Sequence, residues 1–168
     1  MQHALLRYLQ PRYGHVSYER IVSGPGLVAL YEFMRESGLA FPSPQMLAAL
    51  DEEDAAAVIT RYSQYEDEVI ARRVVDLFLS IYGAFTGNLA LALLPRGGIF
   101  ITGGIAAKIA AQLQHGEFLA AFLSKGRFGD LLATLPVHIV LNRNVGLMGA
   151  NLLAQRGAAL PITNDLFM

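Results

Sequence analysis

The sequence of 168 residues contains no cysteine. Without cysteine the chain can form no disulfide, no thiolate nucleophile and no cysteine-ligated zinc or iron–sulfur site. This composition is typical of proteins that work in a reducing compartment. We therefore expect a cytoplasmic protein.

Charge is also scarce. Charged residues make up 16% of the chain, whereas an average soluble domain has about 25%. The 13 basic and 14 acidic side chains nearly cancel. Such a chain lacks the broad positive field that attracts nucleic acid or acidic membrane surfaces, so we expect neither partner. The 54% of hydrophobic residues excludes a disordered chain and, at this length, predicts one folded domain over residues 1–168.

Motifs that indicate an active site by themselves are missing. The sequence has no P-loop, no G-x-G-x-x-G, no H-E-x-x-H and no G-x-S-x-G. The four histidines, His3, His15, His115 and His138, lack the paired spacing of metal ligands. We therefore predict no metal site and assign no catalytic residue, and His138 is expected to be an ordinary residue of a strand.

Because charged residues are few, the chain has a larger share of apolar residues than the core of a single domain requires. The stretch from Leu77 to Leu94 is uncharged and reaches the length of a membrane span, but it contains Ser80, Thr86 and Asn88. We favour burial in the domain core or against a protein partner over a membrane span.

Apolar spacing predicts mainly helices in the first 94 residues. Proline, glycine and capping residues set their expected ends. We expect a helix over 4–9 that stops before Pro11, a turn over 18–21 begun by Ser17, a helix over 27–36 after a break at residues 24–26, a helix begun by Ser43 and Pro44, another after the acidic residues 51–54, and a long helix over 65–94.

The remainder predicts an α/β arrangement. Runs rich in β-branched residues at 99–102 and 137–141 indicate strands, the first of them buried and central. Helices are expected over 105–113, 118–123, 130–135 and 146–156. This order predicts a parallel pair of strands joined by a right-handed crossover. Two strands form a narrow sheet, so either other strands escape recognition or the chain belongs to a larger protein.

Two segments could bind a ligand. Gly103 and Gly104 follow the first strand and precede a helix, which suits either a nucleotide against the backbone or simply a tight turn. Glu19 and Arg20 lie in an otherwise apolar stretch just before a Gly-Pro-Gly sequence. Glu19 could bind a ligand, pair with Arg20 or face water.

The order of motifs along the chain resembles the C-terminal half of a bacterial glucokinase. The Ser-Gly-Pro-Gly-Leu and Lys-Gly-Arg-Phe sequences are specific to that family, whereas the Gly-Gly pair is shared with hexokinases and actin-like ATPases more widely. Four blocks carry the resemblance: residues 14–27 (GHVSYERIVSGPGL), 87–91 (GNLAL), 98–105 (GIFITGGI) and 125–128 (KGRF).

The resemblance implies a fold and an activity. The fold is α/β, the large C-terminal domain of the actin-like ATPase (ribonuclease H-like) class, rich in helix with a small sheet. The implied enzyme has two domains around a cleft, and it transfers the γ-phosphoryl group of Mg²⁺-bound ATP to the 6-hydroxyl of glucose. The N-terminal catalytic domain is expected to be absent from this chain.

The resemblance also assigns roles to residues. Glu19 matches the glutamate that accepts hydrogen bonds from sugar hydroxyls, which suits an ionised, acceptor-only carboxylate. Gly103 and Gly104 match the adenosine motif, and Gly146 lies in a turn that resembles another wall of the adenine pocket. The family usually has proline where this chain has Val145, which weakens that last match.

Other parts of the family's active site have no match here. The phosphate loops, the catalytic aspartate, the Glu-x-x-His sugar motif and most of the Mg²⁺ site lie upstream in the family. Because phosphoryl transfer depends on them, the 168 residues alone are expected to be inactive. The alternatives are a binding or dimerisation module without catalysis and a sugar kinase of different specificity.

Homodimer formation is a further implication of the resemblance. Residues 65–85 of the long helix are candidates for an interface between two copies. Burial of the same residues inside the domain is an equal alternative.

Overall fold

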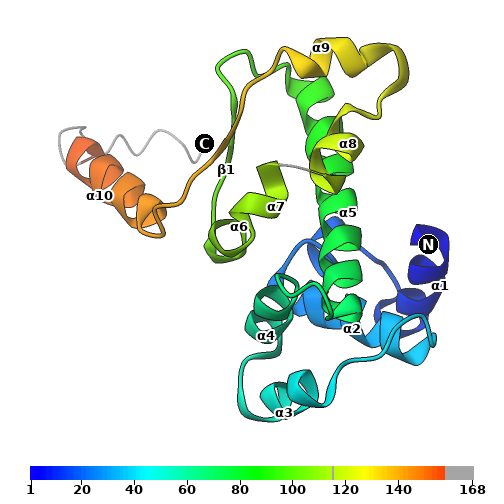
Figure 1. Ribbon diagram of the computed structural model, residues 1–168. Coiled ribbons are helices and arrows are strands. Elements are labelled where there is room, and N and C mark those ends of the chain that lie inside the picture. Colours follow the sequence, from blue (N-terminus) through cyan, green and yellow to red (C-terminus); the bar gives the residue numbers. More distant parts are fainter. Residues whose placement is uncertain (115, 158–168) are drawn as a thin grey trace.

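The computed structural model describes residues 1–114 and 116–157 (Figure 1). Most of the described chain is helical. Its elements are α1 (Gln2–Tyr13), the 3₁₀ turn η1 (Tyr18–Arg20), α2 (Gly24–Glu36), α3 (Pro44–Glu52), α4 (Ala55–Tyr62), α5 (Val69–Leu93), β1 (Ile99–Ile101), α6 (Gly104–Lys108), α7 (Ala110–Gln114), α8 (Glu117–Leu123), the 3₁₀ turn η2 (Gly126–Phe128), α9 (Gly129–Ala133), β2 (Val137–Ile139) and α10 (Val145–Gly157).

The two strands form the predicted parallel pair. Ile99 lies opposite Val137, and the register continues to Ile101 opposite Ile139. Helices α6 to α9 make the crossover, so the prediction of a helix-rich α/β domain with a small sheet is confirmed. The expectation that β1 is a buried central strand is only partly confirmed: Ile101 is buried, but the strand is not central among the described residues. Phe100 is 63% exposed and stacks only on the ring of His138, because β2 is the single neighbouring strand among the described residues.

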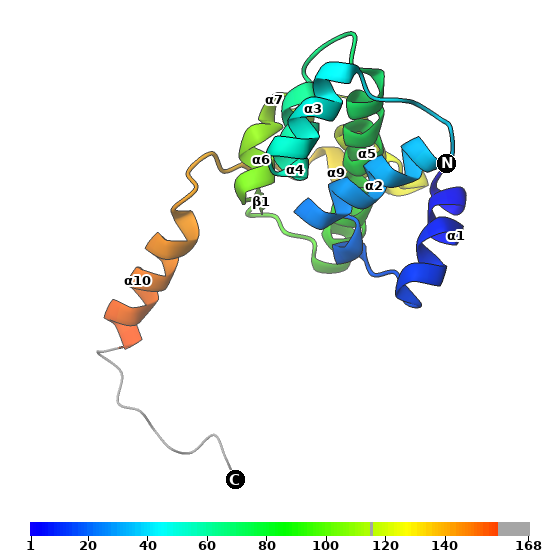
Figure 2. The same ribbon diagram turned by 90° about the horizontal axis from the view of Figure 1, so that it is seen from below.

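Helix α5 forms the centre of the core. It crosses the domain and packs against α2, α4, α8 and α9 (Figures 1 and 2). By length and composition α5 could cross a membrane, but 56% of its most apolar window is buried inside the domain, as in a core helix. The residues considered for an interface between copies therefore bury much of their apolar surface internally, among them Ile70, Val74, Val75, Phe78 and Ile81.

Two glycines allow α5 and α8 to approach closely. A Cβ atom on Gly83 would overlap the carbonyl oxygen of Phe118, and one on Gly87 would lie 2.7 Å from Lys125 Cε. Lys125 Nζ then donates to the Ala84 carbonyl oxygen at 2.9 Å and to Asn88 Oδ1 at 2.7 Å. These contacts bring the Gly-Asn-Leu and Lys-Gly-Arg-Phe sequences together in the fold.

Replacing Gly83 with alanine is therefore expected to destabilise the fold. The added methyl group meets backbone rather than a flexible side chain, so α8 must shift, and overpacking of this kind costs about 1–3 kcal/mol. Chemical unfolding measures the change. Gly149→Ala is the control, since a Cβ on this helical glycine of α10 meets nothing within 4 Å; equal unfolding midpoints for the two variants would contradict the packing described for Gly83.

Several predicted helix ends differ from the structure. Helix α1 continues through Pro11, which donates no backbone hydrogen bond, and ends at Tyr13, where Gly14 takes φ +64°. Gly24-Pro25-Gly26 does not break a helix but begins α2, since the Ser23 hydroxyl accepts the Gly26 N–H at 3.1 Å and proline fits a first turn.

Other ends follow the same capping rules. Ser43 caps α3, as predicted, by accepting the Met46 N–H at 3.1 Å. Asp54 caps α4 through the Ala57 N–H, whereas Asp51 and Glu52 belong to the last turn of α3. The helix predicted over 105–113 is divided into α6 and α7, because the buried Ile109 leaves helical geometry.

Helix α10 projects away from the rest of the domain (Figure 2). It follows β2 and the segment that contains Arg143, and it contains no buried residue. Residues 158–168, the last part of the predicted single domain, lie outside the described residues, as does His115.

Candidate functional site

Glu19 lies on the η1 turn beside a cavity of about 560 Å³. Among the described residues its carboxylate has no hydrogen-bond or salt-bridge partner. Pairing with Arg20 is not observed, because the Arg20 guanidinium lies over the ring of Tyr13, 4.8 Å from its centre. A carboxylate beside a cavity and free of protein partners can accept hydrogen bonds from a ligand. The cavity is lined by Tyr13, His15, Ser17, Glu19, Arg20, Ser23 and Pro25 and is called the Glu19 cavity below.

Local contacts hold the η1 turn in place. A Cβ on Gly26 would overlap the Ile21 carbonyl oxygen, so only glycine lets the start of α2 lie against the turn. On the other side, the ring of Tyr18 stacks on Phe85 of α5 with 4.4 Å between ring centres. The Ser-Gly-Pro-Gly sequence thus fixes the backbone that carries Glu19.

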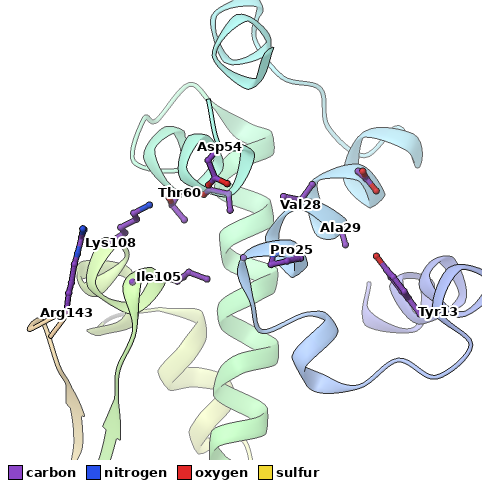
Figure 3. A pocket seen from close by; sticks show the side chains of 13 residues that line it. Tyr13, Pro25, Val28, Ala29, Asp54, Thr60, Ile105, Lys108 and Arg143 are labelled. Carbon is purple, nitrogen blue, oxygen red and sulfur yellow. Dashed lines mark hydrogen bonds between the residues drawn. The ribbon is translucent and has the colours of Figure 1, made fainter. Parts of the chain in front are cut away.

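A larger cavity of about 750 Å³ lies between α2, α4 and α6 (Figure 3). Its apolar walls include Val28 and Ala29 of α2 and Ile105 of α6. Ten further residues complete the lining, and the cavity is called the Gly104 cavity below. They are Tyr13, Gly24, Pro25, Glu32, Asp54, Ala56, Thr60, Gly104, Lys108 and Arg143.

Of the two predicted nucleotide-binding glycines, Gly104 lines this cavity and Gly103 does not. Gly103 has φ 113° and ψ 166°, a combination almost restricted to glycine, and it makes the tight turn before α6. Gly104 lines the cavity. A Cβ on either residue would meet nothing within 4 Å, so the backbone here is open to close approach by a ligand.

The third predicted nucleotide-binding glycine, Gly146, lies outside the Gly104 cavity. It lies near the start of α10 and does not line the Gly104 cavity, whereas Arg143, three residues earlier, does. Its predicted role in the adenine pocket stays a prediction.

Four charged side chains line the Gly104 cavity. Lys108 and Arg143 stand at one end, and Glu32 and Asp54 contribute two carboxylates (Figure 3). Asp54 also accepts the Ala57 N–H at 2.8 Å. Within residues 1–114 and 116–157, no group of three or more histidine, aspartate or glutamate side chains is placed to hold a metal ion.

The two cavities share Tyr13 and Pro25. The end of α1 that carries Tyr13 is tied to α2, because Arg12 pairs with Glu32 at 2.6 Å and Tyr8 donates to Glu36 at 2.8 Å. Burial and this bond to Glu36 raise the pKa of Tyr8 to about 12, so its hydroxyl stays protonated as a donor. Glu19 and Gly104 therefore face adjoining spaces with a common wall.

Sequence reasoning missed several residues of the Gly104 cavity. Tyr13, Thr60 and Arg143 belong to no motif, and they meet only when α1, α4 and the segment after β2 come together. Lys108 carried a usable signal, because it follows Gly104 by four residues and so lies on the same face of α6.

Comparisons with known proteins agree with these motifs. A family model described as Glucokinase matches residues 1–157. A glucokinase of Nostoc sp. is 41% identical over 93% of this chain and 49% of its own length. A glucokinase of Synechocystis sp. is 43% identical over 87% of this chain and 45% of its own length.

A solved structure gives the same result. The crystal structure of a glucokinase from an Antarctic psychrotroph superposes with a TM-score of 0.73 and 28% identity, over 92% of this chain and 45% of that one. The chain thus spans about half the length of the relatives that it matches. The resemblance noted in the four sequence blocks is confirmed: the chain belongs to the glucokinase family.

Proposed function

We propose that this chain supplies one half of the active site of an ATP-dependent glucokinase that phosphorylates the 6-hydroxyl of glucose. The observation that carries the proposal is that Glu19 and Gly104 line adjoining cavities separated by a shared wall. A sugar in one cavity and a nucleotide in the other would lie next to each other. Phosphoryl transfer requires this proximity.

In this proposal the Glu19 cavity binds the sugar. The partner-free carboxylate accepts hydrogen bonds from sugar hydroxyls, and charge-assisted bonds of this kind are strong. Ser17, Ser23 and His15 line the same cavity and can exchange further hydrogen bonds with a polyhydroxylated ligand. The cavity thus offers a polyhydroxylated ligand a carboxylate, a guanidinium and two serine hydroxyls.

The Gly104 cavity would bind the nucleoside part of ATP. Its open glycine backbone and apolar walls fit a flat, largely uncharged group. Bound ATP would supply the phosphoryl group. In the family the phosphate loops and most of the Mg²⁺ site lie upstream of the matched segment, so the phosphates and Mg²⁺ are expected to be held mainly by the half of the enzyme that this chain does not match.

The same division applies to catalysis. No residue of the two cavities is assigned here as the base that accepts the proton of the sugar hydroxyl, and in the family this base lies upstream. A binding or dimerisation module without catalysis and a sugar kinase of different specificity are the alternatives. A homodimer and a cytoplasmic location stay part of the proposal.

A test of the nucleotide assignment uses this chain joined to the half of the Synechocystis glucokinase that it does not match, called the joined enzyme. Gly104→Val is expected to raise the KM for ATP several-fold, because the side chain enters the Gly104 cavity, and to leave the KM for glucose unchanged. Gly97→Val is the control, since Gly97 lines neither cavity and is also free of neighbours within 4 Å. An unchanged KM for ATP in Gly104→Val would refute this placement of the nucleotide.

A further inference from the structure

We propose that Tyr13 is a binding residue shared by the sugar and nucleotide cavities, and that its ring forms the partition between them. This inference rests on the proposed function and names a residue that no motif indicates. Tyr13 and Pro25 are the two residues that line both cavities. Pro25 is fixed in the first turn of α2, so Tyr13 is the larger and more adjustable part of the common wall.

The position of Tyr13 follows from the end of α1. Gly14 takes φ +64° directly after it and turns the chain toward η1. Figure 3 shows the side chain of Tyr13 at the opposite end of the Gly104 cavity from Lys108 and Arg143. Tyr13 is 39% exposed, so a ligand in either cavity can reach it.

Two sets of contacts hold the ring. The guanidinium carbon of Arg20 lies 4.8 Å from the ring centre, which is within the range of a cation–π interaction. The preceding residue, Arg12, is bonded to Glu32 at 2.6 Å and to Glu36 at 3.3 Å. Because Arg20 directly follows Glu19, the partition and the sugar-binding carboxylate are parts of one connected structure.

The chemistry of the ring suits both neighbours. Arg20 covers one face of the ring, so its free face and its edge are left to contact the apolar C–H surface of a hexose and to limit the space open to a nucleotide and to water. Phenylalanine has a ring of the same shape without the hydroxyl. We expect the ring rather than the hydroxyl of Tyr13 to determine ligand binding. Loss of the ring would merge the two cavities and weaken the binding of both ligands.

The test measures ligand binding to the joined enzyme by saturation-transfer NMR, with glucose and ADP as separate probes. Tyr13→Ala is expected to weaken both ligands at least threefold, whereas Tyr13→Phe binds both within twofold of the wild type. Glu19→Gln should weaken glucose alone, and Gly104→Val should weaken ADP alone. Tyr13→Leu, which keeps an apolar side chain without a flat ring, should weaken both ligands and serves if the alanine variant fails to fold.

The outcomes separate the two proposals. If the wild type binds glucose and ADP but loss of the Tyr13 ring leaves either one unaffected, the shared partition is wrong and the proposed function stands. Equal losses in the phenylalanine and alanine variants would also overturn the role of the ring. If the wild type binds neither probe, the proposed function fails and the partition fails with it.

Discussion

Replacing Glu19 with glutamine in the joined enzyme is expected to lower kcat/KM for glucose roughly 10- to 150-fold. The range follows from the 1.5–3 kcal/mol typical of a hydrogen bond to a charged group, at about 1.4 kcal/mol for each factor of ten. Glutamine keeps the shape of the side chain but replaces one acceptor oxygen with a donor. The KM for ATP should stay within about twofold, because Glu19 does not line the Gly104 cavity.

A matched control tests whether the effect belongs to the cavity. Glu52→Gln makes the same chemical change on an exposed residue at the end of α3, outside both cavities. It should leave kcat/KM for glucose and the KM for ATP unchanged. Equal kinetics for Glu19→Gln and Glu52→Gln would remove Glu19 from the sugar site, and a parallel rise in the KM for ATP would indicate a general disturbance of the η1 turn.

Local signals in the sequence predicted the order of elements well. The β-branched runs gave both strands and their parallel pairing, and Ser43 with Pro44 gave the start of α3. Errors arose where a proline or glycine was taken to interrupt a helix whatever its place relative to the helix ends. Pro11 was expected to end a helix but lies in the last turn of one, and Gly24-Pro25-Gly26 was expected to be a break although Ser23 caps it as a helix start.

Burial was harder to predict than element type. The pattern of Phe100 is that of a buried strand residue, yet the side chain is 63% exposed, because burial depends on neighbours that one strand cannot specify. For the apolar residues of α5, the sequence left open whether they are buried within the domain or against a partner. Many of them are buried within the domain. Periodicity indicates which face is apolar but does not show what covers it.

The candidate site also contains residues that the sequence indicates and residues that it does not. Glu19 and the Gly103–Gly104 pair were accessible from the sequence because they belong to motifs. Tyr13 was not, because it comes to line both cavities only through the packing of α1 against α2. The distance along the chain from Tyr13 to Gly104 leaves no local pattern to detect.

The central claim is that this chain contributes one half of an active site and needs the other half for catalysis. Glucose-dependent ADP release, measured with Mg²⁺ and ATP for the 168 residues alone and for the joined enzyme, tests it most directly. The account predicts no activity above background for the chain alone, because the phosphate loops and the base are expected elsewhere, and clear activity for the joined enzyme. Glucose 6-phosphate formed by the purified 168 residues alone, or a folded joined enzyme that forms none, would contradict it.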